Sequence, residues 1–133
     1  MTETRNQPDC TLAELIAAAL GEARAASIAL DAVVDVVDHE LLITRVQEIF
    51  AVARLPVEED LDAIRELADL LLEVADAERW WWLPEDAETP IEELTPVGRQ
   101  IQHAYARLCA ARAAAARAAD RLRAEAIVAA HLR

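Results

Sequence analysis

The side chains that could do chemistry in this sequence are few, and Asp35, Asp38, His39 and Glu40 form the tightest group of them. Asp35 and His39 stand four residues apart, so on a helix they would share one face. That spacing can place two ligands on one metal ion. No second group of acids and histidines lies opposite in the sequence. The group is therefore interpreted as a solvated face beside a helix kink, with metal binding as the less favoured alternative.

A second set of acids forms two E-x-x-D pairs on one predicted helix: Glu66 with Asp69, and Glu73 with Asp76. The stretch from residue 65 to 72 resembles the second metal-binding helix of the MazG-like, all-α nucleotide pyrophosphatases. In that family an upstream E-x-x-E helix supplies the remaining Mg²⁺ ligands. Residues 21–25 begin in a similar way, but residue 25 is alanine and the E-x-x-E is absent. The resemblance implies a Mg²⁺-dependent nucleotide hydrolase, whereas the residues alone favour exposed acids beside a leucine stripe.

Other catalytic patterns are not recognisable in the sequence. His103 and His131 have no sequence partners, and Gly21 and Gly98 are too isolated to form a phosphate-binding loop. We therefore predict no catalytic residue and no cofactor. The only two cysteines, at positions 10 and 109, are too far apart for a disulfide framework or a zinc motif. They predict a reduced, cytoplasmic protein.

The run Trp80–Trp82 is the most unusual feature of the sequence. Consecutive residues of a helix lie about 100° apart, so three tryptophans cannot share one narrow buried stripe. Trp81 continues the apolar stripe of its predicted helix, which leaves Trp80 and Trp82 to cover something else. Three interpretations stay open. The side chains cap the end of a bundle under residues 83–95, form a protein interface of the kind tryptophan favours, or line a small-molecule site.

Composition and periodicity predict an all-α fold that positions these residues. Alanine, leucine, glutamate and arginine, which are strong helix formers, dominate a chain with 2 glycines and 5 prolines. Apolar residues recur at helical spacing. They predict an elongated bundle of three long helices and a short one, over residues 11–54 (with a kink or break near 38–41), 58–82, 90–94 and 96–131.

Local signals mark the ends of these segments. Thr11 and Glu14 form a capping-box pattern at the start of the first segment, and Pro56 stops that segment. Thr89 and Pro90 are a typical start of a short helix. The long first and last helices are expected to be antiparallel partners.

The last helix carries the clearest candidate interface. Its apolar positions step by four and three residues, as in a coiled-coil seam, but most are alanine after the third member and one is arginine. Small residues allow a second backbone to approach closely, so this seam predicts a close helical neighbour. Its members are Ile101, Tyr105, Leu108, Arg112, Ala115, Ala119, Leu122, Ala126 and Ala129.

Charge is divided unevenly along the chain, whose net charge is −12. Residues 1–95 carry 23 acids and 6 arginines, a net −17, while residues 96–133 carry 2 acids and 7 arginines, a net +5. The excess of acids over the whole chain, and the presence of only one aromatic residue in the last helix, disfavour direct nucleic-acid binding. We expect the arginines to face acids within the chain or in a second subunit.

These features predict a polar, disordered tail over residues 1–10 and one helical domain over residues 11–133. No stretch reaches the roughly 18 apolar residues that span a bilayer, so no membrane association is expected. The favoured function is a non-enzymatic protein–protein interaction or regulatory module that forms a homodimer or binds another protein. The alternatives are an acidic mimic of nucleic acid from a phage or mobile element, suggested by the acids of residues 58–93, and the Mg²⁺-dependent hydrolase.

Overall fold

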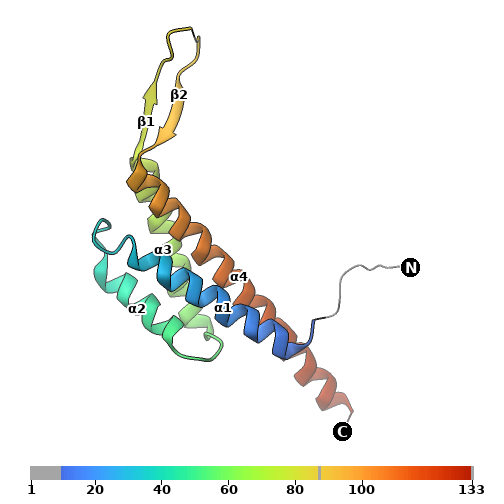
Figure 1. The fold of residues 1–133 in the computed structure, drawn as a ribbon. Helices are drawn as coiled ribbons and strands as arrows, with labels where there is room; N and C mark the ends of the chain where they lie inside the picture. Colours follow the sequence, from blue (N-terminus) through green and yellow to red (C-terminus); the bar gives the residue numbers. More distant parts are fainter. Residues whose placement is uncertain (1–9, 87, 133) are drawn as a thin grey trace.

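The computed structural model describes residues 10–86 and 88–132 of the 133-residue chain. The described part contains four helices and one two-stranded hairpin, and most of it is helical (Figure 1). The predicted all-α class is thus confirmed. In chain order the elements are α1 (Leu12–Asp31), α2 (Glu40–Ala51), α3 (Glu58–Ala77), β1 (Arg79–Trp82), β2 (Ile91–Leu94) and α4 (Pro96–His131).

The long helix α4 is the element on which the others are assembled. Helices α1 and α3 both pack along it, and α2 packs against α1 and α3 to complete the bundle (Figure 1). Helix α1 runs antiparallel to α4: Arg121 of α4 contacts Cys10 just before α1, and Arg107 of α4 reaches Glu22 in the middle of α1. The first and last helices are therefore antiparallel partners, as the sequence suggests.

The core lies between the four helices and is built from leucine, isoleucine and valine set among alanines. Leu30, Ile64, Leu67, Ile101 and Leu108 are fully buried. The faces of α1 and α4 that meet are mostly alanine, and small side chains at a contact bring two helix axes toward the close end of the usual 8–10 Å range. The core cluster consists of Ala26, Ala29, Leu30, Val33, Val37, Ile43, Val46, Ala63, Ile64, Leu67, Ala68, Leu71, Ala75, Ile101, Ala104, Leu108 and Ala111.

Helix α1 begins with the capping box that the sequence indicates. Glu14 donates its backbone N–H to Thr11 Oγ1 at 3.1 Å, and the Thr11 N–H donates to Glu14 Oε1 at 2.8 Å. The bond from the Thr11 backbone favours the ionised form of Glu14 and so lowers the pKa of this carboxyl group. The cap fixes where α1 starts along α4.

The predicted segment 11–54 is two helices, so the break is the alternative that holds, and it lies at residues 32–39 rather than near 38–41. Residues 32–39 form turns between α1 and α2, and Val33 and Val37 from this segment are buried in the core. β-Branched and aspartate residues are among the poorer helix formers. The valines of this segment, with Asp35 and Asp38 among them, therefore form turns instead of continuing the helix. Two of these valines still point into the core.

One predicted helix boundary and one predicted element type are wrong. The helix predicted over residues 58–82 ends at Ala77, and the short helix predicted over 90–94 is strand β2. Aromatic residues favour extended backbone on a paired ribbon. The start signals at Thr89 and Pro90 specify a single turn, which is too short to offset the cost of helix nucleation. Pairing between β1 and β2 satisfies the backbone groups of both segments instead.

The predicted tail over residues 1–10 lies outside the described residues except for Cys10. Within residues 10–86 and 88–132, no helix combines the length and the apolar character needed to cross a bilayer.

Candidate interaction surfaces

The three tryptophans lie on a hairpin arm, which we define as residues 79–94, that projects beyond one end of the helical bundle (Figure 1). Strands β1 and β2 are antiparallel, with Arg79 opposite Leu94, Trp80 opposite Glu93, Trp81 opposite Glu92 and Trp82 opposite Ile91. Successive side chains of a strand point to opposite faces. Trp80 and Trp82 therefore share one face of the arm with Ile91, and Trp81 occupies the other.

All three tryptophan side chains are open to solvent in this chain. Trp80 is 43% exposed, Trp81 is 64% exposed and Trp82 is 37% exposed. The expectation that Trp81 continues the core stripe is wrong, because the helix carrying that stripe stops before it. The interpretation that the tryptophans cap the bundle under residues 83–95 is also wrong. That segment belongs to the same arm and extends away from the bundle (Figure 1). Leu83, directly after β1, is 61% exposed and enlarges this apolar surface.

Ion pairs fix the root of the arm to α3. Arg79 donates from Nε to Asp76 Oδ1 at 3.0 Å and from Nη1 to Glu92 Oε1 across the two strands. Hydrogen bonds to Asp76, which has the larger effect, and to Glu92 raise the pKa of the Arg79 guanidinium above its usual value. Arg79 thus links the last turn of α3 to both strands.

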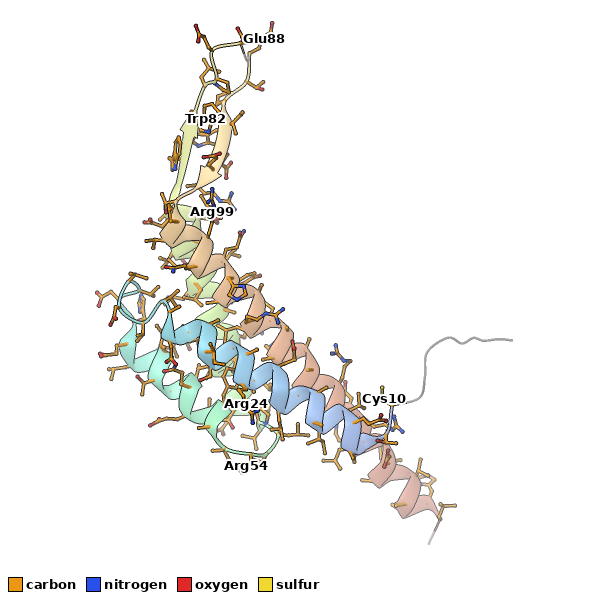
Figure 2. The ribbon with its side chains drawn as sticks, viewed as in Figure 1. Cys10, Arg24, Arg54, Trp82, Glu88 and Arg99 are labelled. Atoms are coloured by element: carbon orange, nitrogen blue, oxygen red, sulfur yellow. The ribbon has the colours of Figure 1, made fainter. Side chains whose placement is uncertain are left out.

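A second set of contacts joins the arm to the start of α4. The Thr95 N–H donates to the Glu78 backbone oxygen at 3.2 Å, and Thr95 Oγ1 donates to Glu78 Oε1 at 2.9 Å. The same hydroxyl accepts from the Gly98 N–H at 3.0 Å and so caps α4. Figure 2 shows Arg99 at this junction, Trp82 along the arm and Glu88 near its tip.

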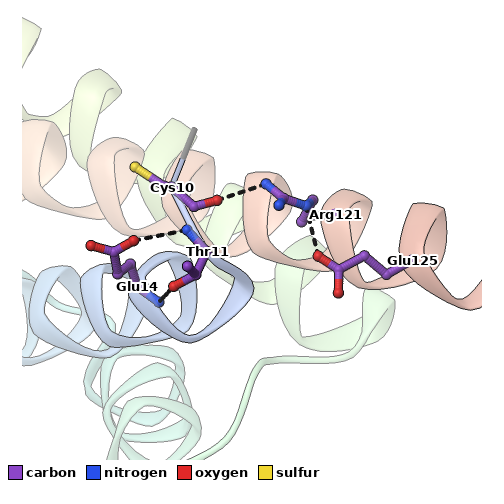
Figure 3. A network of polar contacts seen from close by, with 5 residues as sticks. All are labelled: Cys10, Thr11, Glu14, Arg121 and Glu125. Carbon is purple, nitrogen blue, oxygen red and sulfur yellow. Dashed lines mark hydrogen bonds and ion pairs between the residues drawn. The ribbon is translucent and has the colours of Figure 1, made fainter. Parts of the chain in front are cut away.

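The tail of α4, which we define as residues 119–132, is a second exposed apolar surface. Arg121 donates from Nη1 to the Cys10 backbone oxygen at 2.7 Å and from Nε to Glu125 Oε2 at 2.7 Å, where α1 begins (Figure 3). Beyond this contact the helix continues past α1 (Figure 1). The tail exposes Leu122, Ile127, Val128 and Leu132.

The predicted α4 seam is divided between the core and the surface. Ile101, Leu108 and Ala115 are buried against α1 and α3 within the same chain, so they are not open to a partner. Tyr105 and Ala119 are half-buried, whereas Arg112 and Leu122 are exposed. The part of the seam that a second chain could reach is therefore its C-terminal end.

A groove of 340 Å³ lies between α3 and α4. Arg65 and Asp69 line it from α3, and Tyr105, Cys109 and Arg112 line it from α4. Hydrogen bonding to Cys109, with a smaller contribution from the charge of Asp69, raises the pKa of the Tyr105 phenol. The groove places exposed polar and aromatic groups on the side of α4 that α1 leaves open.

The metal-ligand candidates lie on exposed surfaces. Asp35 and His39 are in the α1–α2 connection, and Glu66, Asp69, Glu73 and Asp76 point outward along α3. Glu22 belongs to α1, which packs on α4 and α2, and its carboxylate lies 4.0 Å from Arg107 Nη1. Among the described residues, no three His, Cys, Asp or Glu side chains gather as a possible metal site.

In the described part of the chain, no ion pair joins an arginine of α4 to an acid of α3. Arg121 and Arg123 pair within α4, with Glu125 and Asp120, and Arg107 reaches Glu22 of α1. The acids of α3 have Arg79 as their one basic partner there, through Asp76. The expected complementarity inside the chain is thus limited to Arg107 and Glu22, and the acidic face of α3 stays open.

Comparisons of this chain with protein-family models, with curated proteins and with solved structures found no significant match.

The sequence indicates the tryptophans as candidate interface residues but gives no indication that Leu83 and Ile91 enlarge the exposed surface of the arm. Neither side chain is expected at a surface, because the sequence predicts a loop and a short helical turn over this segment rather than a hairpin. Prolines on either side of a turn-rich segment, with aromatic and Ile-Glu-Glu-Leu sequences outside them, are the signal that could have indicated a hairpin.

A glycine pair tests how the arm is rooted. A Cβ atom added at Gly98 would lie 2.9 Å from Glu78 Cβ, whereas one added at Gly21 of α1 meets nothing within 4 Å. We expect Gly98→Ala to lower the free energy of unfolding by about 1–3 kcal/mol through overpacking. Gly21→Ala is expected to raise it by up to about 1 kcal/mol, because alanine is the better helix former. Urea denaturation measures both, and equal effects of the two substitutions would contradict the close packing at the root.

Proposed function

We propose that this chain is a non-enzymatic protein–protein interaction module that acts as a homodimer. The observation that carries the proposal is the pair of apolar surfaces at the two ends of the molecule, the arm and the tail. Single exposed apolar residues are normal on soluble proteins, but contiguous apolar patches mark interaction sites. Tryptophan is also the residue type most enriched where protein interfaces derive their binding energy.

The surroundings of these side chains support this proposal. The tryptophans stand on an arm fixed at its root by Arg79 and Thr95, so little ordering of the backbone root would be needed on binding. The exposed thiols of Cys10 and Cys109 are free, which is in keeping with action in a reducing compartment such as the cytoplasm.

Homodimer formation is tested by light scattering coupled to size-exclusion chromatography over a range of concentrations. The expected result is a mass that rises from that of one chain to that of two as the concentration passes through the micromolar range. Leu41→Ser is the matched control, because Leu41 is 89% exposed and belongs to α2, which is part of neither the arm nor the tail. It should leave the transition unchanged. A strict monomer at high micromolar concentration would contradict the proposed homodimer.

A second candidate function, an acidic mimic of nucleic acid, is favoured by the outer face of α3. From Glu59 onward its exposed acids follow one another at three- and four-residue steps, which places a carboxylate at each turn of about 5.4 Å. A regular row of negative charge is what a phosphate backbone offers to a basic protein. The row consists of Glu58, Glu59, Asp62, Glu66, Asp69, Glu73 and Asp76.

Competition with a labelled duplex tests the mimic. The chain is added to complexes of a short fluorescent DNA with a panel of basic DNA-binding proteins, and anisotropy reports release of the DNA. A mimic would release it from at least one of them, and the variant Glu66→Gln with Asp69→Asn and Glu73→Gln should be at least tenfold weaker. Failure to displace DNA from any member, or equal potency of the variant, would count against this function.

A further inference from the structure

We propose that the groove between α3 and α4 binds a small organic anion that carries a hydrogen-bond donor at its other end. Arg65 and Arg112 hold the carboxylate or phosphate group of this ligand, and Asp69 accepts from its donor. The ring of Tyr105 packs against the apolar part between the two ends. The site lies on one chain, so this inference goes beyond the proposed homodimer and does not depend on it.

Asp69 and Tyr105 form the end of the groove nearer the arm. Helices α3 and α4 lie side by side below the root of the arm (Figure 1). There the Thr95 N–H donates to the Glu78 backbone oxygen at 3.2 Å, which sets the end of α3 level with the start of α4. At the usual helical rise, Asp69 and Tyr105 both lie about 15 Å along their helices from this contact. The two side chains therefore face each other across the groove.

Two arginines form the end of the groove farther from the arm. At the same rise, Arg65 lies about 20 Å and Arg112 about 26 Å from the backbone contact at the root. The step of about 6 Å between them is short enough for two arginine side chains to reach one acidic group. Within residues 10–86 and 88–132, neither guanidinium takes part in an ion pair. Guanidinium groups match carboxylates and phosphates in geometry as well as in charge, so an anion between them satisfies both.

Asp69 gives the end nearer the arm the opposite charge. Besides the hydrogen bond to Cys109, the charge of Asp69 raises the pKa of the Tyr105 phenol, which shows that this carboxylate acts at the level of the ring. An ionised carboxylate accepts hydrogen bonds and donates none, so a hydroxyl or ammonium group of a ligand fits here. The two ends lie about 6–12 Å apart along the helices, which suits a small aromatic molecule with a polar group at each end.

The walls of the groove are helices that are held in place by the core. Ala68 at its base is buried, and Leu61 and Ala116 are half-buried. All of the lining residues belong to α3 and α4, so α1 and α2 leave the groove open. Its volume of 340 Å³ is in the range of pockets that bind small molecules, roughly 300–1,000 Å³. Side chains on packed helices are also positioned more precisely than side chains on loops, so little ordering is needed on binding.

Titration of 4-(aminomethyl)benzoate into the full-length chain, followed by NMR of the backbone amides, tests this site. The probe carries a carboxylate and an ammonium group at opposite ends of a benzene ring. We expect saturable shifts in the millimolar range or below, concentrated in α3 and α4 around the groove. Benzylamine, which lacks the acidic group, should bind at least about tenfold more weakly. Benzoate and phenyl phosphate, compared directly, identify the acidic group that the arginines prefer.

Substitutions in the groove test the role of each end. Arg65→Gln and Arg112→Gln should each weaken binding of 4-(aminomethyl)benzoate at least about fivefold, because each removes a charge-assisted hydrogen bond. Asp69→Asn should abolish the preference for this probe over benzoate. Arg117→Gln is the matched control, because Arg117 is exposed on α4 but does not line the groove. It should leave the affinity unchanged.

Three results would overturn the site. They are the absence of saturable shifts with every anionic probe, shifts that concentrate outside α3 and α4, and an equal loss of affinity in Arg112→Gln and Arg117→Gln. The amide spectrum of each free variant verifies that the substitution leaves the fold intact. Failure of the site would leave the mass measured by light scattering unaffected, so it is distinguishable from failure of the proposed homodimer.

Discussion

The packing of α1 and α3 on α4 is the interaction on which the rest of the structure depends. Helix α4 is 36 residues long and spans about 54 Å, whereas α1 and α3 have 20 residues each. No single neighbour can therefore cover it from end to end. Alanines on the facing sides bring α1 close, and Ile101 and Leu108 lock α4 into the core. The uncovered length becomes the tail.

The arm follows from the same geometry at the other end. The chain must reverse its direction between α3 and α4, and it does so through the two-stranded ribbon of the arm rather than through a short loop. Glu78, Arg79 and Thr95 hold the ribbon at its root, and among the described residues the ribbon contacts α4 through β2 next to that root. The molecule thus has a well-packed bundle in the middle and an exposed apolar surface at each end, on the arm and on the tail. The arm carries a net charge of −4, whereas the tail has none.

How far the sequence predicts this structure depends on whether the signal is local. The capping box at Thr11 and Glu14, the stop before Pro56 and the long last helix were predicted, because caps, prolines and apolar period are read within a few residues. The hairpin was not, because Trp80–Trp82 continue a helical stripe locally and become a strand only by pairing with Ile91–Leu94. The seam of α4 was predicted as a stripe, but its division between core and surface depends on where α1 begins. The candidate interaction surfaces could be identified only from the structure, because the exposure of a side chain depends on how the whole bundle is assembled.

Hydrogen–deuterium exchange at low and high protein concentration tests most directly whether a second copy covers the two ends. If it does, amide protection in residues 79–94 and 119–132 should rise together as the concentration passes through the dimerisation range. Exchange in α2 should stay the same, because that helix lies outside both surfaces. Unchanged exchange in the arm and the tail across a range where the mass doubles would show that the chains associate elsewhere and would contradict the account.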